Sequence, residues 1–311
     1  NGQRIEVWPD AYRLNLTKHH EPATARNDLI KRWESWGFGA FVCFNLNQFT
    51  GEEICKADDP RLYNPTQLDV AGWVRAFKAA GMRYAVLTAR HTAPFLLWDS
   101  PTTEIDVASS GNTNDVCRLF VEECRRQGLV PAFYYCLWGG EWNPEPNARA
   151  VVLAQLYELA TRYGEIPYFW IDMMNWAPTN LSTQQIYDAL KNLQPNTMVE
   201  FNQHVQDGTQ IKYWPTDVID GEMVPPPPGG HNPIRTVNGK NYYLPFDYCF
   251  VSQSRPGGYD YDSLGKSCWF TYGEGKSFAP SRPFSAEALA KKSRQGWERG
   301  AHNVLLAAAP D

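Results

Sequence analysis

The chain has 311 residues, 43% of them hydrophobic and 20% charged, which is enough for one large globular domain with a full core. Its net charge of -5 and the lack of a basic run argue against a nucleic-acid partner, because phosphate backbones are bound by basic surfaces. The sequence has no run of 18 apolar residues, so it predicts no membrane-spanning helix.

Aromatic residues are abundant, with 12 Trp, 16 Tyr and 15 Phe. Aromatic rings stack on the C–H faces of sugars, although a large barrel also buries many of them in its core. The seven Cys form no C-x-x-C pair, and no His, Asp or Glu spacing is typical of a metal site. We therefore expect no metal and no cofactor, and the charge favours a neutral or acidic small substrate.

Short apolar runs alternate with amphipathic stretches along most of the chain. In the predicted helix over 68–81, Val70, Val74 and Phe77 share one face, and Gly81 ends the helix. Helices of this kind are predicted over 68–81, 115–127, 147–163 and 182–193. Buried strands are predicted over 38–44, 83–89, 129–138, 166–172, 197–202, 211–214, 267–272 and 302–309.

This alternation predicts the fold class. Continuous apolar strands separated by helices are typical of a parallel sheet covered on its outside. About eight such units in this length favour a closed (β/α)8 barrel of the TIM type over an open sheet, and no G-x-G-x-x-G turn points to dinucleotide binding. We expect one α/β domain over 1–311, with the Pro/Gly/Tyr-rich residues 223–262 as long loops on the C-terminal face of the strands.

Active sites of such barrels lie at the carboxyl ends of the strands. Asp172 ends the run YFWID, where a carboxylate follows four apolar residues. Because an unpaired buried charge is costly, this carboxylate either faces a cleft or finds a partner such as Arg90. The polar residues that end or follow predicted strands are Cys43, Asn45, Arg90, His91, Tyr134, Tyr135, Trp170, Asp172, Asn202, Asp217 and Glu222.

A glycosidase requires a second carboxyl group across the bond to be cut. The segment WPTDVIDGE supplies Asp217, Asp220 and Glu222 after the predicted strand 211–214, and each of them is also compatible with a solvated loop acid. His91 either bonds a sugar hydroxyl or is a satisfied core histidine. No G-x-S-x-G elbow is present, so a serine hydrolase lacks support.

Five segments resemble the α-L-fucosidase family, glycoside hydrolase family 29. In chain order they are FGAFVCFNLNQFTGEE, LDVAGWVRAFKAAGMRYAVLTARHTAPFLLWDS, LVPAFYYCLW, YFWID and RGAHNVLLAAAPD. The resemblance implies a catalytic barrel and a retaining mechanism, with the aspartate of the W-x-D strand end as nucleophile. That aspartate is Asp172 here, and Trp170 lines the sugar site beside it.

The same resemblance implies the acid/base and the sugar contacts. WPTDVIDGE resembles the family's G-D-x-x-T-P-E segment, which favours Glu222 as acid/base, whereas a register against a G-N-E loop favours Asp217. Glu53 resembles the family's loop glutamate, and Tyr134 and Tyr135 its paired tyrosines. The residues expected to contact the substrate are Cys43, Asn45, Glu53, His91, Thr92, Tyr134, Tyr135, Trp170 and Trp214.

The sequence also departs from the family pattern. Cys43 and Thr92 stand where the family has sugar-facing histidines, and Ala93-Pro94 replaces an Asp-Gly. Lost hydrogen-bond donors change which sugar fits a site. The chain also ends at Asp311 without the C-terminal β-sandwich that many members append, and its start at Asn1 without Met is typical of a processed, secreted or periplasmic protein.

The resemblance therefore leads us to expect a retaining exo-glycoside hydrolase that releases terminal α-L-fucose or a closely related L-sugar from glycans. It also implies an oligosaccharide or polysaccharide as the partner. An α-L-galactosidase and an endo-acting fucanase are alternatives within enzymes. A catalytically silent glycan-binding barrel is the alternative outside them, and the lost histidines motivate it.

Overall fold

The computed structural model describes most of the chain. The described residues are 14–51, 54–138, 147–204, 209–222, 224–251, 253–254, 272–273, 276–277, 282–283, 286–299 and 301–308.

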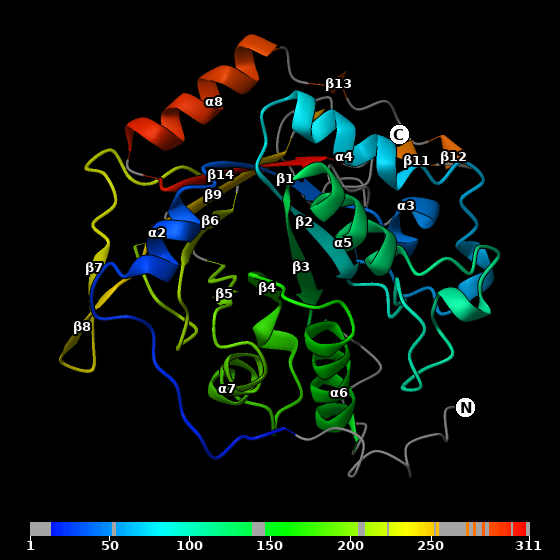
Figure 1. Ribbon diagram of the computed structural model, residues 1–311, viewed down its shortest axis with the longest axis horizontal. Helices are drawn as coiled ribbons and strands as arrows, with labels where there is room; N and C mark the ends of the chain where they lie inside the picture. Colours follow the sequence, from blue (N-terminus) through cyan, green and yellow to red (C-terminus); the bar gives the residue numbers. More distant parts are fainter. Residues whose placement is uncertain are drawn as a thin grey trace.

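Eight strands form one parallel sheet in the described part (Figure 1). They are β1 (Phe38–Val42), β2 (Tyr84–Arg90), β3 (Val130–Cys136), β4 (Tyr168–Asp172), β5 (Met198–Phe201), β6 (Ile219–Glu222), β9 (Phe246–Val251) and β14 (Asn303–Ala308). Their order across the sheet is β5-β4-β3-β2-β1-β14-β9-β6, so each strand lies beside its neighbour in sequence and the last strand pairs with the first.

The two outermost strands, β5 and β6, meet at a single parallel bridge between Glu200 and Val218. Beside it, the N–H of Asp217 donates to the carbonyl of Val199 at 2.8 Å. This strand order is that of a (β/α)8 barrel, and the predicted fold class is confirmed.

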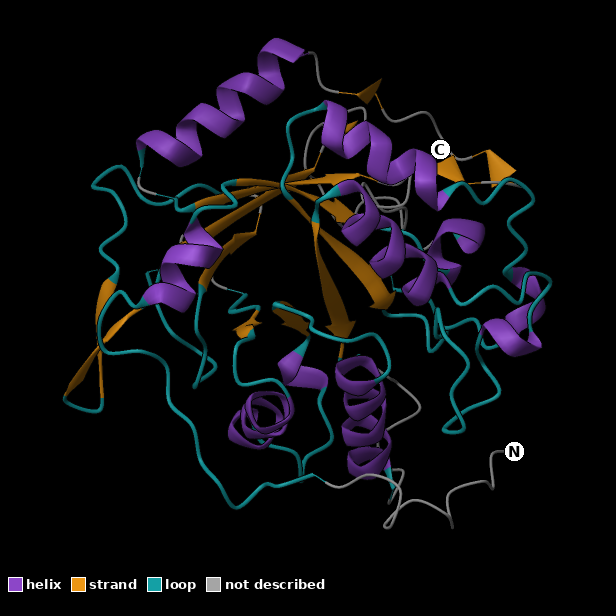
Figure 2. Ribbon diagram, viewed as in Figure 1, coloured by secondary structure: helices purple, strands orange, loops and turns teal. Residues whose placement is uncertain are grey.

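The four predicted helices are confirmed within two residues at each end. The helices are α2 (Asp28–Glu34), α3 (Leu46–Thr50), α4 (Val70–Ala79), α5 (Val116–Gln127), α6 (Ala148–Thr161), α7 (Thr183–Leu193) and α8 (Ala286–Glu298), with 3-10 turns η2 (Pro60–Leu62), η3 (Val107–Ser109) and η4 (Met174–Trp176). Caps define their ends: the Asp115 carboxylate accepts from the N–H of Arg118, and Gly128 ends α5 in the left-handed region. The helices lie around the outside of the strands (Figure 2).

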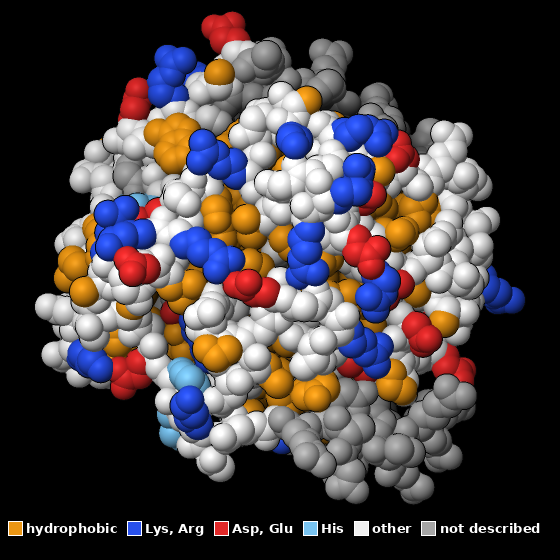
Figure 3. All heavy atoms as spheres, viewed as in Figure 1, with side chains coloured by type: hydrophobic (Ala, Val, Ile, Leu, Met, Phe, Trp, Pro, Cys, Tyr) orange, Lys and Arg blue, Asp and Glu red, His pale blue; other side chains and the backbone are white. Residues whose placement is uncertain are grey.

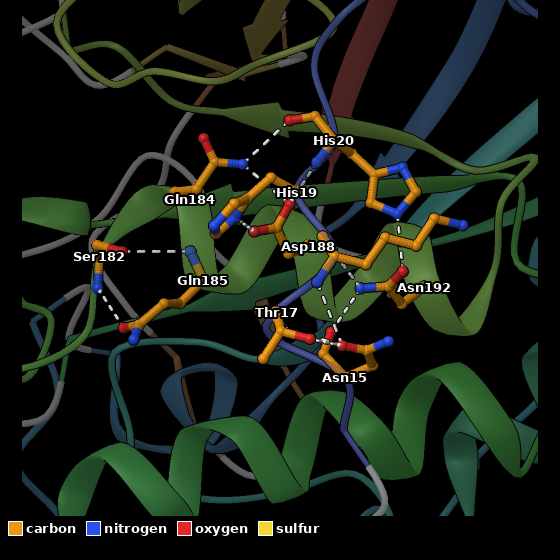
Figure 4. Close-up of polar contacts among 10 residues, drawn as sticks. Asn15, Thr17, His19, His20, Ser182, Gln184, Gln185, Asp188 and Asn192 are labelled. Atoms are coloured by element: carbon orange, nitrogen blue, oxygen red, sulfur yellow. Dashed lines mark hydrogen bonds and ion pairs between the residues drawn. The ribbon is translucent and has the colours of Figure 1, made fainter.

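Helix α7 is held from outside by the segment 14–20 (Figure 4). The buried Asp188 carboxylate accepts from the backbone N–H of His20 at 2.8 Å and lies 2.7 Å from Nδ1 of His19. At the start of the helix, Ser182 and Gln185 form a reciprocal capping box. These contacts hold the segment 14–20 against α7 and define the start of the helix.

Two barrel strands were missed by the sequence, and one predicted strand is wrong. Residues 211–214 form no strand, because the N–H groups of Lys212 and Tyr213 both donate to Oε1 of Gln203 instead of to a neighbouring strand. The strand of this region is β6, and β9 lies inside 223–262, which the sequence predicted to be only loops. The predicted strand 267–272 lies outside the described residues except Tyr272.

The rest of 223–262 and the chain beyond it hold short antiparallel pairs. They are β7 (Ile234–Val237) with β8 (Lys240–Tyr243), β10 (Gln253–Ser254) with β13 (Arg282–Pro283), and β11 (Tyr272–Gly273) with β12 (Lys276–Ser277).

The barrel has an inner and an outer core, because successive strand residues point to opposite faces. Outward residues such as Phe133 and Phe169 pack against the helices. Inward residues such as Tyr84, Tyr134 and Trp170 fill the barrel. On the face seen in Figure 3, acidic and basic side chains are interspersed. No described helix combines the length and apolarity that a bilayer crossing requires.

Gly39 in β1 faces the ring of the fully buried Tyr84, and a Cβ there would overlap that ring. Because Tyr84 has no free space to move into, Gly39→Ala should lower the free energy of unfolding by about 1–3 kcal/mol, measured by urea denaturation. Gly81→Ala is the control: its Cβ meets no atom within 4 Å, so only the positive φ of 80° contributes, with a loss of about 1 kcal/mol. A smaller loss at Gly39 than at Gly81 would contradict this packing.

Candidate active site

Asp172 ends β4 and receives hydrogen bonds on both carboxylate oxygens. Its Oδ2 accepts from the Tyr134 hydroxyl at 2.6 Å, and its Oδ1 accepts from the N–H of Met173 at 2.6 Å and from Nδ2 of Asn202 at 3.0 Å. The side chain is buried, and burial by itself raises the pKa of a carboxyl. The hydrogen bonds and the charge of His204 outweigh burial and hold the pKa of Asp172 below its ordinary value, so it is ionised at neutral pH.

Asn202 joins Asp172 to a second carboxylate. Its Nδ2 carries two hydrogens and lies 3.0 Å from Oδ1 of Asp172 and 2.9 Å from Oε2 of Glu222, so these two oxygens are at most about 6 Å apart. The N–H of His204 donates to Oδ1 of Asn202 at 2.9 Å. Because that oxygen is the acceptor there, the amide nitrogen must be the atom that faces the carboxylates.

His204 completes the surroundings of Asp172. It lies in the loop after β5 with a φ of 49°, and its Nε2 is 3.1 Å from Oδ1 of Asp172. Burial lowers the pKa of this imidazole, but the hydrogen bond and charge of Asp172 raise it above the ordinary value overall. The sequence analysis missed His204, whose one signal was its place two residues after Asn202.

A stack of rings supports the hydroxyl that bonds Asp172. The ring of Tyr134 lies 5.4 Å from that of Trp170 at 27°, and 5.5 Å from that of His91 at 19°. Phe41 packs edge-on against Trp170 at 5.6 Å. Burial lowers the pKa of His91 to about 4, so this ring is neutral at neutral pH and can donate or accept a hydrogen bond.

The two tyrosines singled out by sequence point in opposite directions. Tyr134 points into the barrel, whereas the Tyr135 hydroxyl donates to Oε1 of Gln155 on α6 at 2.6 Å. They are adjacent in β3, so the pleat sends them to different faces. Only Tyr134 reaches Asp172.

Three other residues that the sequence predicted to contact the substrate make contacts within the protein. The Asn45 amide nitrogen contacts the carbonyl of Thr88 at 3.3 Å, and its Oδ1 caps α3. Oγ1 of Thr92 accepts from the N–H of Cys55 at 3.2 Å, and Trp214 packs on Tyr242 at 4.6 Å. Cys43 is buried within the inner core, and Glu53 lies outside the described residues.

Asp217 is part of a buried ion pair with α7. Its carboxylate lies 2.6 Å from Nζ of Lys191, accepts from the Tyr187 hydroxyl at 2.6 Å, and accepts from the N–H of Val199 at 2.9 Å. All these partners belong to α7 or β5. The geometry therefore brings Glu222, and not Asp217, beside Asp172.

A second layer of acids lies inside the barrel below this pair. The Tyr168 hydroxyl contacts both Oε2 of Glu200 and, at 3.0 Å, Oδ2 of Asp247. One hydroxyl hydrogen serves only one acceptor, so the other contact requires a proton on a carboxyl group. Burial raises the pKa of Glu200 and Asp247 well above their ordinary values and that of Asp220 to about 7.

The described residues contain no group of three or more His, Cys, Asp or Glu that could hold a metal ion. A separate cleft of about 320 Å³, lined by residues that include Gly164, Glu165 and Gln194, lies at the opposite, amino end of the strands. It contains no pair of carboxylates. Among the residues that the structure describes, the carboxylate pair of Asp172 and Glu222 is therefore the candidate for acid–base or nucleophilic chemistry.

The family model described as "Alpha-L-fucosidase" matches residues 22–222, a range that includes Tyr134, Asp172, Asn202 and Glu222. A putative alpha-L-fucosidase 1 of Oryza sativa subsp. japonica is 33% identical over 151 residues, and alpha-L-fucosidase 1 of Arabidopsis thaliana is 31% identical over 149. Each match covers 45% of this chain and 29% of the relative, so it spans less than a third of the relative's length.

Solved structures extend the likeness to the fold. A putative alpha-L-fucosidase from Bacteroides thetaiotaomicron aligns with a TM-score of 0.70 and 24% identity over 94% of this chain and 64% of that chain. Alpha-L-fucosidase isoenzyme 1 from Paenibacillus thiaminolyticus aligns with a TM-score of 0.67 and 22% identity over 93% of this chain and 71% of that chain. At these identities the likeness shows a shared fold.

Asp217→Asn separates a structural role from a catalytic one. The change leaves the Lys191 ammonium buried without its charged partner, so the free energy of unfolding should fall by about 3–5 kcal/mol in urea denaturation. Activity per folded molecule should stay close to that of the parent chain. Asp59→Asn, in the exposed pair with Arg61, is the control and should leave stability nearly unchanged. Lost activity with unchanged stability would contradict this role.

Asp220 should make stability depend on pH. Its pKa is about 7 in the folded state against an ordinary 3.8, so unfolding releases a proton in that interval. The contribution of protonated Asp220 to the free energy of unfolding is fully present below about pH 4 and is lost as the pH rises to 7. Asp220→Asn keeps the acceptor for the N–H of Gln203 but cannot ionise, so relative to the parent it should gain stability from pH 4 to 7, by up to roughly 4 kcal/mol.

The difference in free energy of unfolding between Asp220→Asn and the parent is measured by urea denaturation at pH 5 and pH 8. Asp28→Asn is the control for removing an exposed carboxylate. An Asp220→Asn variant that is equally stabilised or destabilised at both pH values would show that Asp220 does not carry the proton.

Proposed function

The chain belongs to the α-L-fucosidase family, and from this premise we propose that it is a retaining exo-glycoside hydrolase that releases terminal α-L-fucose or a closely related L-sugar from glycans. The observation that carries this proposal is the bridge from Asp172 through Asn202 to Glu222. Retaining glycosidases hold their two carboxyl groups about 5–5.5 Å apart, whereas inverting ones leave about 6.5–9.5 Å for a water. The limit of about 6 Å set by the shared amide supports retention.

Asp172 is the nucleophile in this proposal. A nucleophile must be ionised, and the hydrogen bonds that lower its pKa keep it so. Oδ1 faces Met173, Asn202 and His204, whereas Oδ2 accepts its hydrogen bond from Tyr134. Oδ2 therefore has the less crowded lone pairs, and we assign to it the attack on the anomeric carbon.

Glu222 is the acid/base. In the first step it gives its proton to the glycosidic oxygen while Asp172 forms an ester with the sugar. In the second step its carboxylate takes a proton from water, which attacks the same carbon and releases Asp172. The Asn202 amide donates to both groups, so it stays aligned while charge moves from one to the other.

The identity of the L-sugar depends on the residues around this pair. Neutral His91 and the faces of Tyr134 and Trp170 suit a sugar ring with both hydroxyl and C–H surfaces. The buried Cys43 takes the place of a family histidine and removes a hydrogen-bond donor. For this reason an α-L-galactosidase is the second candidate. The intact carboxylate pair argues against a silent sugar-binding barrel.

Covalent trapping tests the proposal. A 2-deoxy-2-fluoro-L-fucosyl fluoride should label the chain once, and peptide mass spectrometry should find the label on Asp172 and none in Asp172→Asn. Glu222→Gln should lower kcat by about 10²–10⁴-fold on an aryl fucoside with a poor leaving group. Nitrophenyl α-L-fucoside and α-L-galactoside compared side by side identify the sugar. A label on another residue would refute the assignment.

A further inference from the structure

Two tryptophans lie just beyond the carboxylate pair, on the loops that leave β3 and β4. Trp138 follows the end of β3 by two residues, and Trp176 ends η4, four residues after Asp172. Their ring centroids are 4.1 Å apart with the planes at 60°. Trp176 is 46% exposed and Trp138 is half-buried. Trp176 therefore presents indole surface to solvent beside Trp138.

The backbone of Trp138 is held by a buried arginine. Arg90 is fully buried, and its Nη1 donates to the carbonyl of Trp138 at 2.7 Å and to that of Cys136. The N–H of Trp138 in turn donates to Sγ of Cys136 at 3.3 Å. These contacts fix the chain as it leaves β3, so the Trp138 ring is carried by a rigid support.

The backbone of Trp176 is tied to the proposed nucleophile. Met173 adopts a φ of 58°, a left-handed conformation that non-glycine residues rarely adopt. Its N–H donates to Oδ1 of Asp172, and its carbonyl accepts from the N–H of Trp176 at 2.8 Å. These two hydrogen bonds link the backbone of Trp176, through Met173, to the Asp172 carboxylate.

The exposed indole of Trp176 lies on the side of the barrel where a bound glycan would extend into solvent. Tyr134 and Trp170 are buried inside the barrel, whereas Trp176 lies further along the chain and reaches solvent. A sugar whose anomeric carbon lies over Asp172 must direct its glycosidic bond out of the barrel, past the strand ends. Trp176 remains 46% exposed although its ring packs against Trp138, and indole faces stack on the C–H faces of pyranose rings.

We propose that Trp138 and Trp176 form a leaving-group subsite, in which Trp176 stacks on the pyranose ring to which the terminal L-sugar is attached. This inference rests on the proposed function and adds the class of leaving group: a sugar with an apolar ring face. It follows that the subsite contributes to kcat/KM only when the leaving group contains a ring. Fluoride, which has none, does not use the subsite.

The experiment compares two substrates with one fucosyl group and different leaving groups. Trp176→Ala should lower kcat/KM for an α-L-fucosyl disaccharide about tenfold, and leave kcat/KM for α-L-fucosyl fluoride within about twofold of the parent. Trp138→Ala should act in the same direction, and Trp176→Phe should recover part of the loss. Trp297→Ala, at an exposed tryptophan on α8, is the matched control and should change neither value.

Equal losses on both substrates would overturn the inference, because the pair would then serve the fucosyl group or the fold. No loss on either would overturn it as well. A binding measurement does not depend on turnover: by calorimetry, Asp172→Asn should bind the disaccharide more weakly when Trp176→Ala is added, with fucose binding unchanged. A parent chain that hydrolyses neither substrate would refute the proposed function alone, and this calorimetric difference would still decide the subsite.

Discussion

The site depends on one amide group. Nδ2 of Asn202 gives one hydrogen to Asp172 and the other to Glu222, and the N–H of His204 fixes its orientation. Two carboxylates this close repel when both are charged, and donors between them offset the repulsion. Asn202 follows β5 and Glu222 ends β6, the two strands that meet at a single bridge. The spacing on which the proposed retaining mechanism depends is therefore set where the two outermost strands meet.

Below the site the interior of the barrel is polar, because Glu200, Asp220 and Asp247 point into it. Most barrels of this type are filled there with branched apolar residues. Glu200 and Asp220 precede Asn202 and Glu222 by two residues on the same strands, so they face the same side. Burial keeps protons on this layer at pH values where an exposed acid is ionised. A protonated acid adds no charge beneath Asp172, which keeps its own charge through hydrogen bonds. Ionised Asp172 therefore lies above acids that keep their protons.

The sequence predicts most of the frame and part of the site. Helices such as α5 were predictable because an Asp cap, an apolar stripe and a terminal glycine coincide. Strands β6 and β9 were missed because Asp220, Glu222 and Asp247 point inward and interrupt the apolar pattern. Asp172 was found from its place after four apolar residues. Tyr134 and Tyr135 are alike in sequence, and only the pleat separates them. The bridge by Asn202 joins residues 30 and 20 positions apart, a contact that no local pattern contains.

The stereochemistry of the first product tests the carboxylate spacing most directly. An α-L-fucoside is hydrolysed in D2O and the anomeric proton of the released sugar is followed by NMR before mutarotation. Carboxyl groups bridged by one amide predict that the α-anomer forms first, through two displacements at the same carbon. If the β-anomer forms first, a water lies between the groups during the reaction, and the close pairing of Asp172 with Glu222 is not the arrangement that acts.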